Sequence, residues 1–134
     1  MVLDRWSRFT PWALTLLRIV AAFLFWEHGA QKLLGVLGRD PVSFPSLLWF
    51  AAILEFFGGI LVALGLWTRP VAFLLSGQMA VAYFMSHAPR GFWPVQNHGE
   101  TAVLYCFVFL FLATAGPGKF SIDGAFSARR EQSG

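Results

Sequence analysis

Apolar residues come in four long blocks along the chain, and polar residues gather between them. The blocks cover about 11–34, 47–67, 70–86 and 99–115, and the segments between them hold proline, glycine and most of the charge. Each block has roughly the length that crosses ~30 Å of hydrocarbon at about 1.5 Å per residue. No block carries the continuous polar stripe of a water-facing helix. The pattern therefore predicts an all-α membrane protein, a bundle of four transmembrane helices.

Composition supports this prediction and narrows it to one domain. The chain has 134 residues, of which 57% are hydrophobic and 13% charged, and its mean hydropathy is +0.61. A soluble domain of this size could not bury so much apolar surface. The first block contains Arg18, Glu27 and His28 with no small-residue cleavage site after it, so we expect a retained helix rather than a signal peptide. We expect a single domain over 1–134, with a polar and only partly ordered C-terminal tail at 116–134.

The distribution of basic residues predicts the orientation. Four spans place both termini on one side of the membrane. That side carries six basic residues and the opposite side three; the six are Arg5, Arg8, Arg69, Lys119, Arg129 and Arg130, and the three are Lys32, Arg39 and Arg90. Positive charge favours the cytoplasmic side, so both termini are predicted to be cytoplasmic. The sequence contains no basic cluster with interleaved aromatic residues, so it gives no indication of nucleic-acid binding.

Polar side chains inside the apolar blocks and in the connection before the last block are the candidate functional residues. A charged side chain at mid-bilayer costs about 3 kcal/mol on insertion scales, so each one needs a reason to be there. The four-span arrangement places most of them in the outer half of the bundle, and Arg18 and Gln78 nearer its middle. The predicted pocket residues are Glu27, His28, Gln31, Lys32, Glu55, Tyr83, His87, Asn97, His98 and Glu100.

Glu55 lies on a helical face rich in small residues. Gly58 and Gly65 follow it on that face, and Gly59 lies beside them. Small residues let membrane helices approach closely, so these three glycines are predicted to be helix-packing positions. A carboxylate on such a face needs a donor, or it must be protonated. The candidate donors are Gln31, Lys32, Tyr83 and the histidines.

Other polar residues have ordinary structural explanations. His28 and Lys32 are four apart and could form a local pair at a helix end, with the lysine reaching to the headgroups. Asn97 and Glu100 have the spacing of a capping box. The histidines lack partners at metal-ligand spacing, so no metal site is predicted. The short Trp67–Pro70 connection predicts that the second and third spans form an antiparallel hairpin.

Four stretches, taken in order, resemble the DoxX family of small bacterial membrane proteins. They are LRIVAAFLFWEHGAQKLLG, LEFFGGILVALGLWTRP, AYFMSHAPRGFWPVQNHGE and LATAGPGKFSID, which run from Leu17 to Asp123. The resemblance implies a multi-pass four-helix bundle in the bacterial inner (cell) membrane. The family takes its name from a subunit associated with quinone-linked oxidation of sulfur compounds, and relatives are described as oxidoreductases or linked to thiol and quinone stress.

The resemblance supplies no established catalytic residue. The positions that match the family pattern are Arg18, His28, Gly29, Gln31, Lys32, Glu55, Gly58, Gly59, Thr68, Arg69, Asn97, Gly99 and Glu100. These positions favour a polar pocket common to the family, but they do not identify its ligand.

Three functions remain open at this point. The first is an accessory subunit of a membrane redox system, with a polar pocket built around Glu27, His28, Gln31 and Glu55 that binds a quinone. The second is a non-catalytic assembly protein that presents Gly58 and Gly65 to a partner. The third is a carrier of a small lipophile, for which the sequence shows no inverted repeat. The expected partners are the lipid bilayer and a membrane protein complex, and a homo-oligomer is also open.

Overall fold

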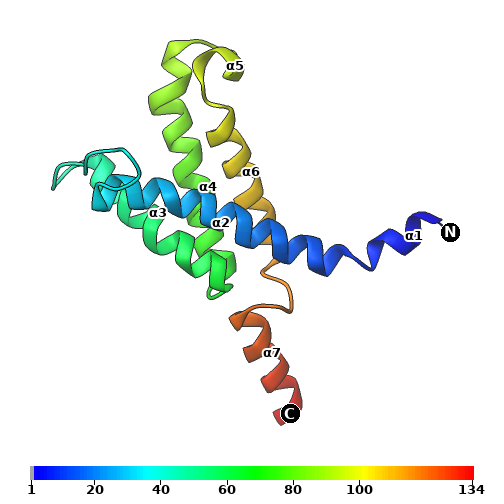
Figure 1. Cartoon of the computed structure of the whole chain (residues 1–134). Helices are drawn as coiled ribbons and strands as arrows, with labels where there is room; N and C mark the ends of the chain where they lie inside the picture. Colours follow the sequence, from blue (N-terminus) through cyan, green and yellow to red (C-terminus); the bar gives the residue numbers. More distant parts are fainter. Residues whose placement is uncertain (1) are drawn as a thin grey trace.

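The computed structural model describes residues 2–134, and this part of the chain contains helices and loops but no strand (Figure 1). Seven α-helices follow one another: α1 (Val2–Ser7), α2 (Thr10–Leu34), α3 (Leu47–Leu64), α4 (Thr68–Ala82), α5 (Pro94–Asn97), α6 (Glu100–Ala115) and α7 (Ile122–Ser133). A π-helical turn (Tyr83–His87) and a 3-10 turn (Ala88–Arg90) extend α4. The predicted all-α class is confirmed.

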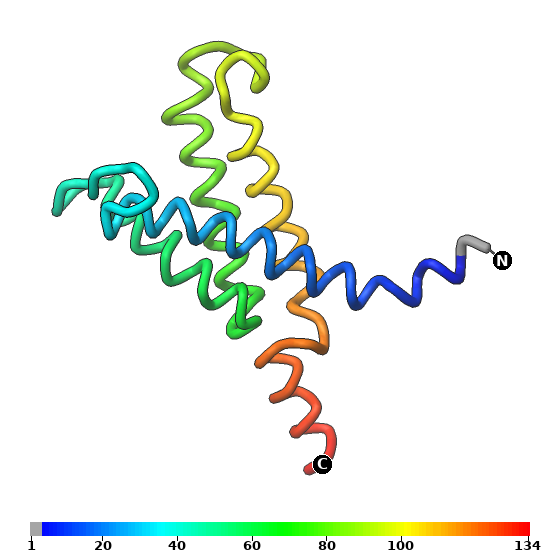
Figure 2. The backbone as a smooth tube through the Cα atoms, viewed as in Figure 1, coloured from blue at the N-terminus to red at the C-terminus, as the bar shows by residue number. Residues whose placement is uncertain are grey.

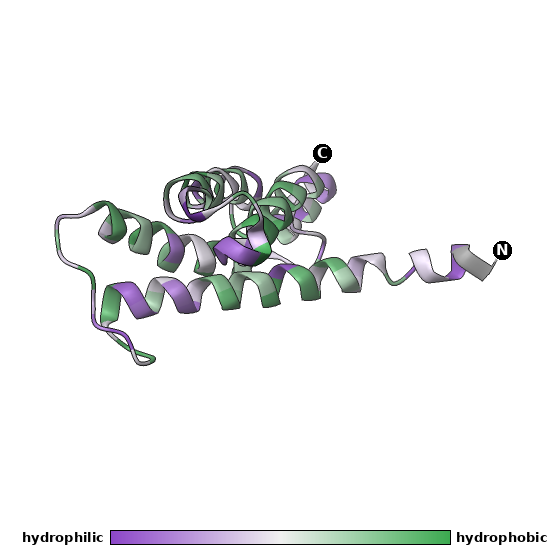
Figure 3. Cartoon of the chain, turned by 90° about the horizontal axis from the view of Figure 1, so that it is seen from above, coloured by the Kyte–Doolittle hydropathy of each residue, from purple (hydrophilic) through white to green (hydrophobic). Residues whose placement is uncertain are grey.

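Three helical segments are long and apolar enough to cross a membrane. They are α2, α3 and the extended α4 segment Thr68–Arg90, whereas α6 is apolar but has only 16 residues. At about 1.5 Å per residue, α6 is shorter than ~30 Å of hydrocarbon. Apolar residues dominate these helices, with hydrophilic turns toward the C-terminal end of α2 (Figure 3). The integral membrane character is thus supported, and the fourth span stays a prediction.

The helices pack as two pairs that cross one another. α2 packs against α3 and α4 against α6, while α3 and α4 share far fewer contacts (Figures 1 and 2). The second and third spans, predicted to form an antiparallel hairpin, are joined by the short connection but cross one another instead of packing along their lengths (Figure 1). Gly65 and Trp67 both adopt left-handed backbone conformations, with φ of 68° and 51°. Two such residues in the connection turn the chain, so that α4 leaves α3 and crosses it.

The small-residue face of α3 packs inside the chain. A Cβ atom added at Gly59 would lie 2.8 Å from Cβ of Trp26 on α2, and one added at Gly58 would lie 2.9 Å from Leu75 on α4. Gly65 ends α3 and lies against Ser121. These three positions therefore serve contacts within one protomer, and a partner seam at Gly58 and Gly65 has no free surface there.

The polar tail at 116–134 includes the last helix of the chain. It contains α7, which begins where the Ser121 side chain accepts a hydrogen bond from the N–H of Gly124 at 3.0 Å. The Asp123 carboxylate accepts the N–H groups of Trp67 and Thr68, each at 2.9 Å, and so joins the start of α7 to the start of α4. A serine cap and a carboxylate at a helix start explain why this polar segment folds.

Arg18 ties the same segment to α2. Its side chain is 1% exposed and donates to the carbonyls of Pro117 and Phe120, the latter at 2.9 Å. A buried arginine whose hydrogen bonds go to backbone carbonyls has a structural reason to be there. At the other terminus, α1 and the first turns of α2 project away from the helix pairs (Figure 2).

Candidate functional site

One cavity, which we call the polar cavity, lies among α2, α3, α4 with its π-helical turn, and α6. Its volume is about 340 Å³. Six titratable side chains, from these elements and from the turn before α6, face it together with apolar residues; the lining comprises Phe25, His28, Lys32, Glu55, Met79, Ala82, His87, His98, Thr101, Ala102 and Tyr105. All three histidines of the chain line this single cavity. Such a mixture of apolar walls and converging polar groups is typical of a small-molecule site.

A buried ion pair forms one wall of the polar cavity. Lys32 Nζ on α2 lies 2.8 Å from both carboxylate oxygens of Glu55 on α3, and the two side chains are 16% and 3% exposed. Gln78 on α4 adds a hydrogen bond from Nε2 to Glu55 Oε1 at 3.2 Å. Among the donors considered from the sequence, the fold thus selects Lys32. Because both charges are paired, the cost of burying them is largely offset.

Several polar groups that line the polar cavity have no partner within residues 2–134. The rings of His28 and His98 and the hydroxyls of Thr101 and Tyr105 make no hydrogen bond there. The His28 ring instead meets the Tyr105 ring edge-on, with 6.3 Å between centroids. Unpartnered donors and acceptors beside apolar walls leave hydrogen-bonding capacity for a ligand.

His87 is held in one tautomer by its neighbour. Its Nδ1 lies 3.1 Å from the backbone carbonyl of Asn97. A carbonyl only accepts, so Nδ1 carries the proton, and Nε2 of the neutral ring keeps a free lone pair. His87 can therefore accept a hydrogen bond from a hydroxyl group.

Asn97 shapes the connection that carries His87 and His98. It is fully buried, and its Nδ2 donates to Tyr83 Oη at 3.2 Å and to the Gly91 carbonyl at 2.9 Å. Its Oδ1 accepts the N–H of Gly99 at 2.8 Å. The predicted capping box is wrong, because α6 begins at Glu100 and no side chain caps it. Asn97 satisfies the loop backbone instead of the helix.

Comparisons with known proteins identify the family of this chain. The DoxX family model matches residues 13–88. The chain belongs to the DoxX family. An uncharacterized protein of Haemophilus influenzae is 41% identical over 128 residues, covering 90% of this chain and 95% of that protein.

Two more distant relatives are named as membrane proteins. The inner membrane protein YqjF of Escherichia coli is 29% identical over 119 residues, covering 79% of this DoxX chain and 85% of YqjF. An uncharacterized membrane protein of Mycobacterium tuberculosis is 26% identical over 137 residues, covering 89% of this chain and 84% of that protein. No solved structure gives a significant match.

Half of the predicted pocket residues of this DoxX protein line the polar cavity, and half do not. Those that line it are His28, Lys32, Glu55, His87 and His98, and those outside its lining are Glu27, Gln31, Tyr83, Asn97 and Glu100. Gln31 donates to the carbonyl of Leu37 at 3.1 Å, in the loop after α2. Tyr83 and Asn97 support the loop, and Glu100 is exposed.

Sequence reasoning missed Thr101 and Tyr105. Both lie on α6 and line the polar cavity. They are four residues apart, so they share one helical face inside an otherwise apolar helix. Two hydroxyl groups on one helical face were the feature of the sequence that could have indicated these two pocket residues. Within the described residues, no group of three or more His, Cys, Asp or Glu side chains is placed to hold a metal ion.

Proposed function

We propose that this DoxX protein is an accessory subunit of a membrane redox system whose polar cavity binds the head ring of a quinone-like lipophile. The observation that carries the proposal is the convergence of all three histidines, Tyr105 and the Lys32–Glu55 pair on one cavity with apolar walls. The chain crosses the bacterial inner membrane four times in this proposal, with both termini in the cytoplasm. The excess of basic residues on that side supports the orientation. The name of the Escherichia coli relative supports the inner-membrane location.

The volume and the lining suit a ring rather than a long chain. At about 340 Å³, the polar cavity lies near the lower end of the ~300–1,000 Å³ typical of small-molecule sites. Phe25 and Met79 provide apolar contact for the faces of a ring, and sulfur and aromatic groups both pack well on such surfaces. An isoprenoid tail would then lie outside, among the lipids.

The polar groups match the two oxidation states of a quinone. The carbonyl oxygens of the oxidised ring only accept hydrogen bonds, and His28, His98 and Tyr105 are free to donate. The hydroxyls of the reduced ring donate, and His87 Nε2 is free to accept. Glu55 and the histidines can hold the protons that accompany reduction. The chain binds the ring and handles protons, while a partner protein exchanges the electrons.

Binding of 2-methyl-1,4-naphthoquinone to the full-length protein in mild detergent tests this function. We expect saturable binding of one molecule per chain by titration calorimetry. Tyr105→Phe removes one donor and should weaken binding about fivefold, the value of one hydrogen bond. Glu27→Gln is the matched control, since Glu27 lies outside the cavity lining and the variant should bind like the wild type.

Two results would count against the redox role. Equal binding by Tyr105→Phe, His28→Gln and Glu27→Gln would show that the naphthoquinone dissolves in the micelle rather than in the cavity. Absence of saturable binding, together with lower abundance of a co-purifying membrane complex in Glu55→Gln, would instead favour the alternative role as an assembly protein.

A further inference from the structure

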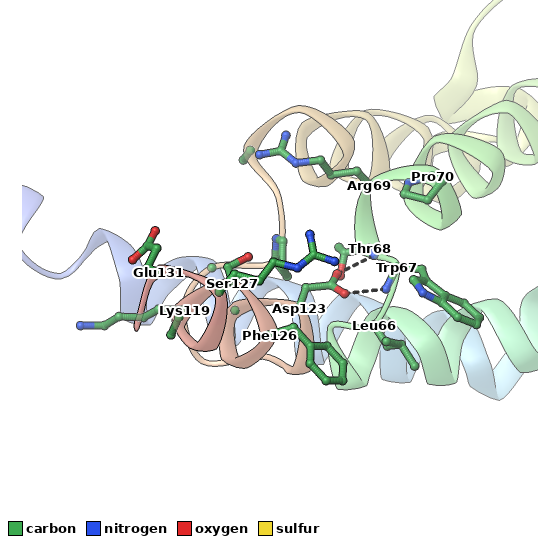
Figure 4. Close-up of a pocket in the computed structure, with 16 residues that line it drawn as sticks. Leu66, Trp67, Thr68, Arg69, Pro70, Lys119, Asp123, Phe126, Ser127 and Glu131 are labelled. Atoms are coloured by element: carbon green, nitrogen blue, oxygen red, sulfur yellow. Dashed lines mark hydrogen bonds between the residues drawn. The ribbon is translucent and has the colours of Figure 1, made fainter. Parts of the chain in front are cut away.

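A second concavity, the α7 groove, lies at the opposite end of the helix pairs from the loop that carries His87 and His98. It has a volume of about 740 Å³ and runs between α7 and the turn that joins α3 to α4 (Figure 4). Exposed aromatic side chains surround it, with Trp67 64% and Phe126 53% exposed. An exposed indole at the end of a membrane helix, such as that of Trp67 before α4, marks the level of the lipid headgroups.

The α7 groove is lined by three cations that lack carboxylate partners. Arg69, Lys119 and Arg130 line it, and none of them forms an ion pair with any carboxylate in residues 2–134. Arg69 Nη1 donates to the carbonyls of Ala113 and Thr114 at the end of α6, which holds the guanidinium in place. No hydrogen bond within the described chain uses the Nε or Nη2 of Arg69.

The carboxylates of the α7 groove do not cancel this charge. Asp123 is occupied, because its two oxygens accept the first N–H groups of α4, where the helix dipole is positive. Glu131 is the second carboxylate, and it lies on the exposed last turns of α7. Three cations face two carboxylates, so the lining carries a net charge of 3 − 2 = +1.

Apolar surface completes the α7 groove. Leu66, Trp67, Pro70 and Phe126 line it beside the cations, as the labelled side chains in Figure 4 show. Thr68 adds a buried hydroxyl that has no partner among the described residues. A free inorganic anion would use the cations and leave the apolar side exposed, whereas an amphiphile with an anionic head would use both.

We propose that the α7 groove binds an anionic phospholipid, with its phosphodiester against Arg69, Lys119 and Arg130 and the start of its acyl chains along Trp67 and Phe126. Basic pockets at the membrane interface bind anionic headgroups in this way. The lipid site depends on the membrane location of the chain and not on the ligand of the polar cavity. It gives α7 a role: the helix closes one side of a lipid site instead of ending the chain as a free tail.

Native mass spectrometry of the delipidated, full-length protein tests the lipid site. The probes are dioleoyl phosphatidylglycerol and dioleoyl phosphatidylcholine, which share their acyl chains and differ in headgroup charge. We expect one tightly bound phosphatidylglycerol per chain and weaker, unsaturable uptake of phosphatidylcholine. Lys119→Gln/Arg130→Gln should raise the dissociation constant of phosphatidylglycerol about 25-fold, since each cation at the interface contributes roughly fivefold.

The control removes the same charge from outside the groove. Arg8→Gln/Arg129→Gln changes two cations that do not line it, and Arg129 is the direct neighbour of Arg130. This variant should bind phosphatidylglycerol like the wild type. Equal weakening in both double variants would overturn the proposal, because net charge rather than the groove would then set affinity. Equal affinity for the two lipids, full displacement of the lipid by equimolar inorganic phosphate, or no saturable lipid uptake would overturn it too.

Discussion

Lys32→Met should be among the most damaging substitutions in this protein that leave its core packing in place. Lys32 Nζ lies 2.8 Å from both oxygens of Glu55, whose side chain is 3% exposed, so the substitution leaves a nearly buried carboxylate without its cation. Removing one partner of a buried ion pair costs about 3–5 kcal/mol. Gln78 still donates one hydrogen bond to the carboxylate, which places the expected loss near the lower end, about 3 kcal/mol.

Substitution of the partner residue Glu55, alone and together with Lys32, tests whether the loss of stability comes from the ion pair itself. Glu55→Gln leaves Lys32 unpaired, but that side chain is 16% exposed and can reach polar surroundings, so we expect a loss of about 2 kcal/mol. Lys32→Met/Glu55→Gln leaves no unpaired charge and should cost no more than Lys32→Met alone. The sum of the losses in free energy of unfolding of the two single variants should therefore exceed the loss of the double variant by about 2 kcal/mol.

The free energy of unfolding, measured by sodium dodecyl sulfate titration in mixed micelles and followed by circular dichroism, checks this cycle. Lys119→Met is the matched control, because Lys119 makes no ion pair in the described chain and the variant should unfold like the wild type. Additive single losses would refute the coupling. So would a Lys32→Met variant that is as stable as Lys119→Met, since the buried carboxylate would then not need its cation.

Three further predictions follow from the packing, the tail and the topology. Gly59→Ala should lower stability by about 1–3 kcal/mol because its added Cβ would lie 2.8 Å from a side chain of α2, whereas Gly77→Ala, with nothing within 4 Å, should be neutral in the same titration. Asp123→Asn should speed amide hydrogen exchange at the start of α4, whose N–H groups Asp123 accepts; unchanged exchange there would mean that the carboxylate does not hold the turn. In a cysteine-free background, membrane-impermeant maleimide should label Ser43→Cys from the periplasm and label Ser133→Cys only after lysis, and labelling of both in intact cells would exclude four spans with cytoplasmic termini.

The polar cavity shows where residue patterns stop being sufficient. Lys32 was equally compatible with pairing along its own helix and with reaching the headgroups, and Glu55 had several candidate donors. Glu27 looked as good a pocket residue as His28, its direct neighbour, yet only His28 lines the polar cavity. Neighbours on a helix differ by about 100° in direction, so their roles depend on where the partner helices lie.

What the amino-acid sequence by itself determined is the all-α class and the approximate limits of the apolar helices. Each block is apolar along its length, and a helical backbone satisfies its own hydrogen bonds, so both properties are local. The observed α2 and α6 match the predicted blocks to within one residue at each end. Of the five predicted pocket residues that line the polar cavity, His28, Lys32 and Glu55 lie within these blocks, and His87 and His98 lie in the connection between the last two.

Tertiary structure alone decided which helices pair, which donor serves Glu55, and what the C-terminal tail does. The pairing of α2 with α3 follows from close approach at Gly59, and the crossing of α4 from the left-handed residues Gly65 and Trp67. The tail folds as α7 because Asp123 and Arg18 bind backbone groups distant in the chain. These contacts join segments far apart in sequence, and lipid, being as apolar as the helices, does not specify them. Close packing and hydrogen bonds between helices specify these contacts instead.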